Sequence, residues 1–418
     1  MKIALLHYSA PPVVGGVESV LGHHARLMAA GGHEVRIVAG RGGDSGPHIR
    51  FAALPLADSR HPDVLASKGQ LDLGRLPADF ATLVGRIEAG LRAALAGVDV
   101  LIAHNVCSLH KNLALTAALF NLHQSGASAA VGRAFRLILW HHDLAWTTPR
   151  YRAELHAGYP WDLLRQDWPG ARHVVVSEQR RGELAALLTL HPEQIAVVPS
   201  GVEAAAFLGL HERAAAIVSR LGLWEAAPLL LLPVRITTRK NIELALRALA
   251  ALRRRASGPE YPYRRAALVV TGPPGPHNPA NAEYFARLKA LRAELGLEGA
   301  AHFLAELTDE YLPDEVIADL YRVADALIMP SREEGFGIPL LEAGLARLPV
   351  FCADIPPLLA LGGSQATYFS PDADPARVAA LIAGRLGEDR QYALAARVRA
   401  EYLWERVYAN QVAPLLEP

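Results

Sequence analysis

Short runs of apolar residues alternate with longer stretches in which apolar residues recur every three to four positions along most of the chain. The short runs are typical of strands buried on both faces of a parallel sheet, and the longer stretches are typical of helices that cover such a sheet. We therefore expect an α/β fold. Because the pattern occurs twice, it predicts two doubly wound domains.

In the first half of the chain, the expected strands lie at residues 2–7, 34–39, 98–103, 137–140, 173–176 and 195–198. The expected helices lie at residues 16–30, 79–96, 111–122 and 178–188. The sequence Pro199-Ser200-Gly201-Val202 then interrupts both periodicities. It predicts the end of a first domain, which we place at residues 1–203.

In the second half, the expected strands lie at residues 229–234, 267–271, 324–329, 350–353 and 367–369. The expected helices lie at residues 241–254, 280–295, 314–321, 339–346 and 375–386. These elements predict a second domain at residues 204–401. The tail, residues 402–418, contains a further helical pattern at 402–416.

Composition adds limits to this picture. A chain of 418 residues accommodates two domains of about 200 residues each. Its 42 basic and 42 acidic residues cancel, so overall charge predicts no nucleic-acid partner. No stretch predicts a transmembrane segment, and peripheral membrane contact stays open. Cys107 and Cys352 fall in different predicted domains, which argues against a disulfide and indicates a cytoplasmic protein.

Residues 331–343 place two carboxylates, two glycines and a proline at a predicted strand-to-helix junction. Gly335 and Gly337 lack a Cβ, so a ligand can approach the backbone, and the free N–H groups of the following helical turn favour a phosphate. The same string also suits a simple capped helix. The candidate donor-binding residues here are Glu334, Gly335, Phe336, Gly337, Ile338 and Glu342.

A basic pair follows the expected strand at 229–234. Arg235 comes directly after it and Lys240 opens the next helix, so both belong at the carboxyl edge of the sheet. A guanidinium and an ammonium there can hold a diphosphate, although a solvated basic loop is the alternative.

Gly15 and Gly16 follow the first expected strand and open a helix, where a phosphate or a substrate can approach the backbone. A plain turn is equally consistent with this pair. The Gly-x-Gly-x-x-Gly fingerprint of dinucleotide-binding folds does not follow that strand.

Histidines end two further strands. His142 follows the strand at 137–140, where it can donate a hydrogen bond to a hydroxyl or to developing charge. His104 and Asn105 follow the strand at 98–103 and are candidate acceptor contacts, as is Trp146 in an aromatic and basic loop. Packing within the loop is the alternative for Trp146. No zinc site is expected at His141 and His142, because adjacent strand residues point to opposite faces.

The spacing of Glu334 and Glu342, with Gly-Phe-Gly and Pro-Leu between them and Pro349-Val350 after them, resembles the Glu-x7-Glu signature of retaining glycosyltransferases of family 4. That family has the GT-B fold, in which two Rossmann-like domains face a central cleft. The resemblance covers essentially the whole chain. It implies that the helix at 402–418 packs back on the first domain.

The resemblance also implies roles for the candidate residues. Arg235 and Lys240 would neutralise the leaving diphosphate, helped by the amides around Gly337 and Ile338. Glu342 would hold the ribose, and Glu334 would hold hydroxyls of the transferred sugar. The loop at Gly15 and Gly16 would approach the donor diphosphate, and His142 would contact the sugar near its reacting carbon.

The implied activity is that of a hexosyltransferase that moves a sugar from a nucleotide diphosphate sugar to an acceptor hydroxyl by same-face transfer. The family's chemistry needs no metal and no cofactor, and the expected acceptor is a small molecule or a carbohydrate. Two alternatives stay open. One is an NAD-dependent oxidoreductase, against which the missing glycine fingerprint counts. The other is a non-catalytic sugar-nucleotide binder with the same fold. A sugar-nucleotide epimerase with this fold is a nearer neighbour, distinguished because it needs no acceptor.

Overall fold

A computed structural model describes residues 1–44, 46–125, 135–255, 263–275, 278–308 and 311–417. The chain divides into two compact units. Unit 1 consists of Met1–Val202 and of the chain from Trp404 onward, and unit 2 consists of Glu203–Leu403. The chain thus crosses between the units after Val202 and after Leu403, where the sequence suggests crossings after residues 203 and 401.

Unit 1 is built on a parallel sheet with the strand order β3-β2-β1-β4-β5-β6-β7. The strands are β1 (Lys2–Leu6), β2 (Glu34–Ala39), β3 (Ile49–Ala53), β4 (Val100–His104), β5 (Arg136–His141), β6 (Arg172–Val175) and β7 (Ile195–Val197). The α-helices are α1 (Gly16–Ala30), α2 (Pro62–Leu71), α3 (Phe80–Ala94), α4 (Leu113–Gln124), α5 (Glu178–Leu188), α15 (Trp404–Val407) and α16 (Ala413–Leu416).

Alternate side chains of β1 enter cores on opposite faces of the sheet, as the pleat of a strand requires. Ala4 and Leu6 pack into the core that contains α3 and α4. Ile3 and Leu5 pack into the core that contains α1 and the C-terminal helices. Unit 1 is therefore doubly wound, with its sheet covered on both faces.

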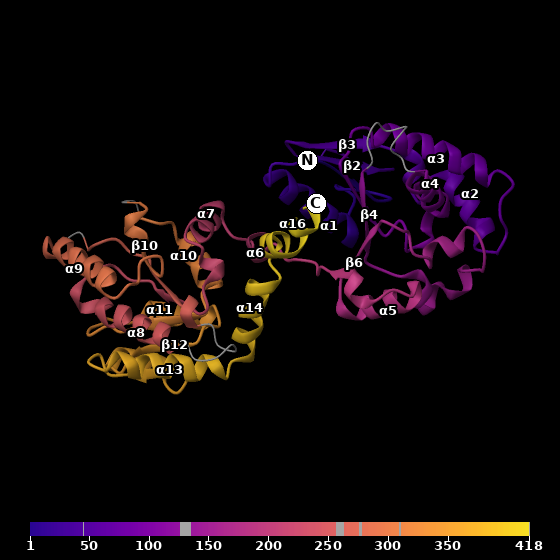
Figure 1. Ribbon diagram of the computed structural model, residues 1–418. Helices are drawn as coiled ribbons and strands as arrows, with labels where there is room; N and C mark the ends of the chain where they lie inside the picture. Colours follow the sequence, from indigo (N-terminus) through magenta and orange to yellow (C-terminus); the bar gives the residue numbers. More distant parts are fainter. Residues whose placement is uncertain (45, 126–134, 256–262, 276–277, 309–310, 418) are drawn as a thin grey trace. The chain divides into compact units, whose positions relative to one another are not determined.

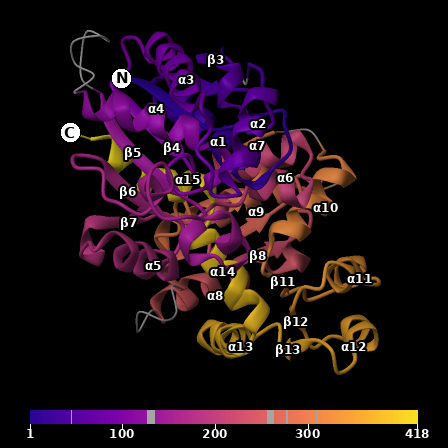
Figure 2. The same ribbon diagram turned by 90° about the vertical axis from the view of Figure 1, so that its right-hand side faces the viewer.

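The C-terminal segment belongs to the packing of unit 1. A π-helical turn, Tyr408–Val412, joins α15 to α16, and Trp404 and Val412 are buried. The Arg136 guanidinium, at the start of β5, donates hydrogen bonds to the backbone oxygens of Leu416 and Glu417. Both ends of the chain consequently lie in this unit, where Figures 1 and 2 show them near each other.

Unit 2 has a second parallel sheet, with the order β10-β9-β8-β11-β12-β13. The strands are β8 (Leu229–Leu232), β9 (Ala267–Val270), β10 (Ala301–Phe303), β11 (Ala326–Met329), β12 (Val350–Ala353) and β13 (Thr367–Phe369). The helices are α6 (Ala204–Leu208), α7 (Glu212–Arg220), α8 (Ile242–Arg254), α9 (Ala280–Glu294), α10 (Asp314–Val323), α11 (Ile338–Leu345), α12 (Pro356–Gly362), α13 (Pro375–Gly387) and α14 (Arg390–Glu401). Helices α11 and α12 lie side by side (Figure 2).

The predicted α/β architecture with two doubly wound parallel sheets is confirmed. Strand β3 is absent from the prediction because its sequence, Ile-Arg-Phe-Ala-Ala, offers only two large apolar residues at the edge of the sheet. Strand β10 was missed because only three residues pair there. Helix α14 was also missed, since none of its residues is buried.

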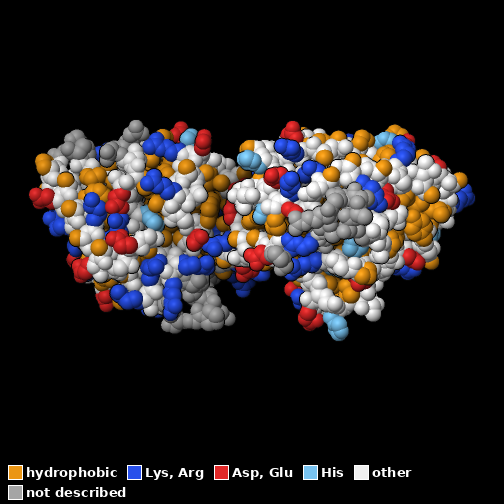
Figure 3. Space-filling view, turned by 45° about the horizontal axis from the view of Figure 1, so that its top comes forward, with side chains coloured by type: hydrophobic (Ala, Val, Ile, Leu, Met, Phe, Trp, Pro, Cys, Tyr) orange, Lys and Arg blue, Asp and Glu red, His pale blue; other side chains and the backbone are white. Residues whose placement is uncertain are grey.

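In each sheet the strand order reverses at one place, between β1 and β4 in unit 1 and between β8 and β11 in unit 2. Loops at the carboxyl ends of strands beside such a reversal form the usual ligand site of a doubly wound sheet. Among the described residues, no helix is both long and apolar enough to span a bilayer. Basic and acidic side chains are interspersed on the face of both units seen in Figure 3.

Candidate functional site

Candidate residues of unit 2 follow β8 and β11, the two strands at its reversal point. Lys240 ends the short 3-10 turn after β8, and Glu334 lies in the loop between β11 and α11. The Lys240 Nζ lies 2.5 Å from Glu334 Oε1, and the two side chains are only 10% and 7% exposed. The fold thus joins two residues that are far apart in sequence into a buried ion pair.

This ion pair is reinforced by its surroundings. The Ser331 hydroxyl donates to the same Glu334 oxygen at 2.7 Å. Burial lowers the pKa of Lys240, and the hydrogen bond to Glu334 opposes that change. The other carboxylate oxygen, Oε2, lies 3.7 Å from the Arg239 guanidinium, which exceeds hydrogen-bonding distance. That oxygen is left to accept a hydrogen bond from a ligand hydroxyl.

Arg235 occupies a different environment from Lys240, although both follow β8. Its side chain is exposed, and it makes no hydrogen bond or ion pair with other described residues. A guanidinium in this state keeps all its donors for a ligand. The two cations therefore differ: one is held by a carboxylate, and the other is uncommitted.

The start of α11 has the features expected of an anion-binding helix terminus. Gly337 is its N-cap residue with a φ of 107°, and a Cβ there would lie 2.7 Å from a Leu358 methyl carbon. Gly335 has open space where its Cβ would be. Phe336 and Ile338 are 56% and 59% exposed. The backbone N–H groups of Gly337 and Ile338 make no hydrogen bond with other described residues, so they are available to a phosphate, whereas the Leu340 N–H donates to the Gly337 oxygen at 3.0 Å.

Glu342 lies on the exposed side of α11, one turn further along. The Tyr321 hydroxyl of α10 donates to Glu342 Oε2 at 2.6 Å, and both residues line a pocket of about 700 Å³ between these helices. Burial and the neighbouring carboxylate raise the pKa of Tyr321, so its proton stays in this hydrogen bond. The second oxygen of Glu342 remains for a ligand hydroxyl.

In unit 1, only one glycine of the pair after β1 has free space where a Cβ would lie. Gly15 is the N-cap of α1, and a Cβ on it would lie 2.0 Å from the Glu18 carboxylate. The Ser9 hydroxyl holds that carboxylate with a hydrogen bond of 2.6 Å to Oε1. Gly16, in contrast, has nothing within 4 Å of its would-be Cβ. The Glu18 carboxylate thus lies beside Gly15, and the role of the glycine pair as a donor contact stays a prediction.

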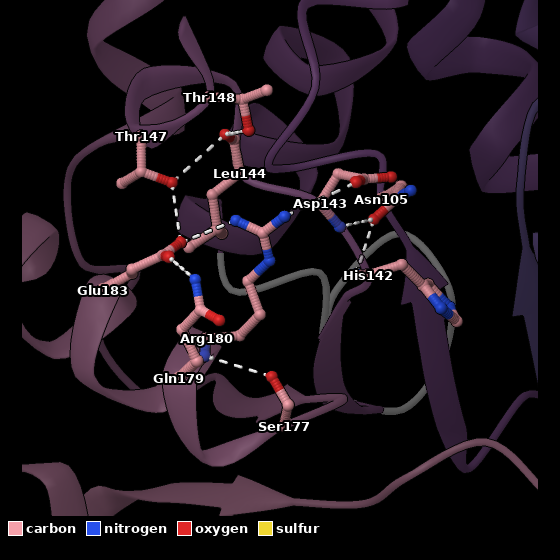
Figure 4. A network of polar contacts seen from close by, with 10 residues as sticks. All are labelled: Asn105, His142, Asp143, Leu144, Thr147, Thr148, Ser177, Gln179, Arg180 and Glu183. Atoms are coloured by element: carbon pink, nitrogen blue, oxygen red, sulfur yellow. Dashed lines mark hydrogen bonds and ion pairs between the residues drawn. The ribbon is translucent and has the colours of Figure 1, made fainter.

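His142 directly follows β5, at the carboxyl edge of the unit 1 sheet (Figure 4). Asn105, which follows β4 with a φ of 58°, accepts hydrogen bonds at Oδ1 from the backbone N–H groups of His142 at 2.7 Å and Asp143 at 3.1 Å. Asn105 is 2% exposed. Its amide oxygen thus fixes the turn that carries His142. Asn105 also lines a pocket at this edge of unit 1, so its role as an acceptor contact stays a prediction.

The His104 side chain is completely buried, and its role as an acceptor contact stays a prediction. Its Nδ1 lies 3.1 Å from His142 Nε2. Burial lowers the pKa of His142 to about 3, so the ring is neutral near pH 7. His141 turns to another partner, with Nε2 3.0 Å from His173 Nδ1, in agreement with the expected divergence of the two adjacent histidines.

A polar network continues from this turn to α5 (Figure 4). Asp143 lies 3.8 Å from the Arg180 guanidinium, and Arg180 pairs with Glu183 at 2.6 Å. The Thr147 hydroxyl donates to the same Glu183 carboxylate at 2.9 Å. The loop after β5 is thereby anchored on both sides of Leu144, which is itself buried.

Trp146 does not present a free aromatic face. Its indole N–H donates to the Trp161 backbone oxygen at 3.3 Å, and the Arg165 guanidinium lies 4.2 Å from its ring centroid. Tyr151 is likewise flanked by the cations of Lys111 and Arg150, 5.1 and 4.7 Å from its ring centroid. Cations thus already lie against these rings, and the role of Trp146 as an acceptor contact stays a prediction.

A pocket of about 370 Å³ opens at this edge of unit 1. Its polar lining includes residues that the sequence did not single out: His7, Tyr8, Ser9, Glu18, Arg41, Ser59, Arg60, Lys111 and Asp143. Their positions in the sequence could have identified them, because they lie in the segments that follow successive strands of this sheet. Arg60 and Lys111 form no ion pair with other described residues.

One cluster among the described residues has the spacing of metal ligands. Atoms of Asp72, His110 and Glu154 lie within 4.8 Å of one another. The Lys68 ammonium, however, contacts Asp72 at 2.6 Å and Glu154 at 3.0 Å. Its hydrogen bond, with that of His110, lowers the pKa of Glu154 to about 2. A protein cation thus already balances these carboxylates.

Curated relatives resemble this chain in full or in part. An MMP alpha-(1->4)-mannosyltransferase of Mycolicibacterium hassiacum is 26% identical over 99% of this chain and 97% of that protein. A D-inositol 3-phosphate glycosyltransferase of Streptomyces scabiei is 32% identical over 50% of this chain, and one of Kineococcus radiotolerans is 35% identical over 44%. The matches span only 45% and 40% of the length of these last two proteins.

Among solved structures, a sucrose-phosphate synthase from Thermosynechococcus elongatus aligns with a TM-score of 0.37 and 17% identity, over 99% of this chain and 98% of that one. The family model described as "Glycosyltransferase Family 4" matches residues 14–206, and the model described as "Glycosyl transferases group 1" matches residues 217–393. These two matches follow one another along the chain and fall on the two doubly wound units. The chain therefore belongs to the family 4 glycosyltransferases, which have the GT-B fold.

Proposed function

We propose that the protein is a retaining glycosyltransferase that moves a hexose from a nucleotide diphosphate sugar to an acceptor hydroxyl. The observation that carries this proposal is the buried pair of Lys240 and Glu334 beside the open N-terminus of α11. It combines a cation, a fixed carboxylate and free backbone N–H groups within one loop cluster. A sugar diphosphate needs this combination, because it offers hydroxyl donors on one side and negative charge on the other.

For the donor, Arg235 and Lys240 would bind the diphosphate together with the N–H groups at Gly337 and Ile338. Lys240 uses one of its three donor hydrogens on Glu334, which leaves two for phosphate oxygens. Glu334 would accept a hydrogen bond from the transferred sugar at its free oxygen. Glu342, with one oxygen bound by Tyr321, would accept from the ribose at the other.

The proposed transfer takes place in one step on one face of the sugar. The bond between the anomeric carbon and the diphosphate oxygen breaks, and its electron pair stays on the diphosphate. The acceptor oxygen forms the new bond on the same face, and its proton passes to a diphosphate oxygen. The protein cations stabilise the charge that develops on the leaving group, so no step requires a metal ion or a protein nucleophile.

The acceptor would bind in the pocket of unit 1 that Tyr8, Glu18, Arg60 and Lys111 line. Carboxylate and hydroxyl groups there suit a polyol or a carbohydrate. The names of two relatives support this class, since one is a D-inositol 3-phosphate glycosyltransferase and the other an MMP alpha-(1->4)-mannosyltransferase. The two buried free thiols support the further proposal that the protein works in a reducing compartment such as the cytoplasm.

The proposal is tested first by thermal denaturation with UDP, GDP, ADP and NAD. We expect one nucleoside diphosphate to raise the Tm and NAD to leave it unchanged. The matching donor sugars are then incubated with polyols and sugars in the presence of EDTA, and products are analysed by mass spectrometry and by the anomeric coupling in NMR. Stabilisation by NAD alone, or an inverted product, would overturn the proposal. Donor binding without transfer or hydrolysis would indicate the non-catalytic binder.

A further inference from the structure

The environment of His104 restricts where its proton can lie. The imidazole is fully buried between the rings of Trp140 and His24, with centroid distances of 5.5 Å to each. Its Nδ1 lies 3.1 Å from His142 Nε2. Its Nε2 is buried and has no hydrogen-bond partner among the described residues. One nitrogen of His104 is therefore bonded and the other is isolated.

Two neutral proton arrangements are compatible with the short contact between these rings. In the first, His104 carries its proton on Nδ1 and donates to His142 Nε2, which leaves an unprotonated and unpaired His104 Nε2 in the buried cluster. In the second, His142 donates from Nε2, and His104 must carry its proton on the isolated Nε2. Among buried backbone groups, orphaned N–H donors are rarer in proteins than under-satisfied acceptors, and the same preference favours the arrangement that leaves an acceptor, and not a donor, unpaired.

Charged arrangements are disfavoured at the same place. A proton added to either ring would put an imidazolium in a buried cluster that also contains His7 and His24. Burial, followed by the repulsion of these neighbours, lowers the pKa of His104 far below its usual range. The first neutral arrangement is therefore the favoured one.

We propose that His104 is a positioning residue that holds His142 in the Nδ1–H tautomer, so that His142 presents a hydrogen-bond donor to the transferred sugar. The inference rests on the proposed function for its consequence, but the tautomer itself does not depend on any substrate. A neutral His142 with a proton on Nδ1 and an occupied Nε2 has no free lone pair. It stabilises an oxygen by donation and cannot remove the acceptor proton.

Hydrogen bonds with His7 and Asn105 hold the backbone of His104 and His142 in place. His7 Nδ1 lies 2.8 Å from the backbone oxygen of His104, and because a carbonyl only accepts, His7 must donate. Asn105 fixes the backbone N–H of His142 at 2.7 Å. The ends of β1, β4 and β5 are thus bonded together around the two rings.

The tautomer is measured directly by long-range ¹H–¹⁵N NMR correlation of the full chain with ¹⁵N-labelled histidine at pH 7.5. We expect a pyrrole-type Nδ1 and a pyridine-type Nε2 for His142, and the same pattern for His104. Signals are assigned by their loss in His104→Asn and His142→Asn. A pyridine-type Nδ1 in His142 would overturn the inference, whether or not any transfer activity is found.

Kinetics of the same chain test the positioning role. His104→Leu removes the donor, and we expect kcat to fall about 10- to 100-fold with the donor KM within about threefold, the size of effect seen when an outer-shell partner of a histidine is lost. His104→Asn places an amide N–H near the former Nδ1 and should recover most of the loss. Equal impairment of the two variants, or an unchanged kcat in His104→Leu, would contradict the role.

The matched control is His173→Leu, which removes the other buried histidine pair, the one between His173 on β6 and His141 on β5. It should leave kcat unchanged, even if stability falls. Folding of each variant is checked by circular dichroism and Tm. If His104→Leu does not fold, the wild-type NMR pattern and His104→Asn still decide. Correct tautomers in a protein that transfers no sugar would refute the proposed function and leave this inference standing.

Discussion

The Lys240 ammonium lies 2.5 Å from Glu334 Oε1, although 94 residues separate the two in sequence. Both side chains are almost completely buried. Since removal of one partner leaves an uncompensated buried charge, the stability of unit 2 and the binding of its ligand are coupled at this pair.

Replacement of Lys240 by methionine should therefore cost stability as well as activity. We expect Lys240→Met to lower the free energy of unfolding by about 3 kcal/mol, the cost of breaking a buried pair, while the protein stays folded. The double variant Lys240→Met/Glu334→Gln should be about 1–3 kcal/mol more stable than the sum of the single effects. Urea unfolding followed by circular dichroism measures this coupling. Strict additivity would show that the pair does not act as a unit.

Replacement of Arg235 should lower activity and leave stability almost unchanged. Because its side chain is exposed and unpaired among the described residues, Arg235→Ala should change the free energy of unfolding by less than about 0.5 kcal/mol. Loss of a preorganised contact to the leaving group should lower kcat by about 100-fold or more. Arg247→Ala, which removes an equally exposed arginine from α8, is the control and should retain activity. An Arg235→Ala enzyme with normal turnover would remove this residue from the mechanism.

The sequence predicts the fold well because parallel strands are buried on both faces. Runs such as Leu229–Leu232 stay entirely apolar, so they are visible without tertiary information. Strand β3 lies at a sheet edge and keeps a polar Arg50, so its pattern resembles a loop. The positions of Lys240 and Glu334 at one switch point follow from strand order. The ion pair between them does not, since it depends on side-chain burial.

The unit 1 site was harder to predict for a related reason. His104 and Asn105 end an apolar strand, which correctly places them at the rim, but the sequence gives no measure of depth. In the structure both residues are buried, and each is hydrogen-bonded to His142. Glu18 was overlooked because its return over Gly15 is a local contact of side chain with backbone, which strand and helix patterns do not encode.

Glu342 and Tyr321 make a further prediction about the donor. Glu342→Gln replaces a charged acceptor by a neutral one and should weaken nucleoside diphosphate binding about tenfold, because hydrogen bonds to charged groups contribute about 1.5–3 kcal/mol. Tyr321→Phe leaves the carboxylate in place and should weaken binding less, since only its orientation is lost. Isothermal titration calorimetry with the nucleoside diphosphate that raises the Tm measures both. A larger effect for Tyr321→Phe would contradict the assignment of Glu342 as the ribose contact.

The unpaired cations of the unit 1 pocket should affect the acceptor and not the donor. We expect Arg60→Gln and Lys111→Gln each to raise the acceptor KM about tenfold, the loss of one charge-assisted contact, while the donor KM stays constant. Arg75→Gln, an exposed residue outside the pocket lining, serves as the control. Steady-state kinetics with each substrate varied in turn separates the two constants. An unchanged acceptor KM in both pocket variants would place the acceptor elsewhere.

The buried histidines of unit 1 should make its stability depend on pH. Burial lowers the pKa of His24 and of His142 to about 3, whereas an unfolded histidine titrates near 6.5. Below about pH 6.5 the unfolded chain binds protons that the native state does not. Stability is therefore complete above that pH and is lost as the pH falls toward about 3, by up to about 1.4 kcal/mol per pH unit for each histidine.

His24→Phe tests this dependence, because phenylalanine keeps the edge contact with Trp140, whose ring centroid lies 4.6 Å away. Urea unfolding between pH 5 and 7.5 should show a shallower slope for His24→Phe than for the wild type, by about one proton. This window lies above the titration of carboxylates, so their protonation contributes little. His191→Asn, at an exposed position, should reproduce the wild-type slope. An identical slope in His24→Phe would mean that His24 already takes up its proton in the folded protein.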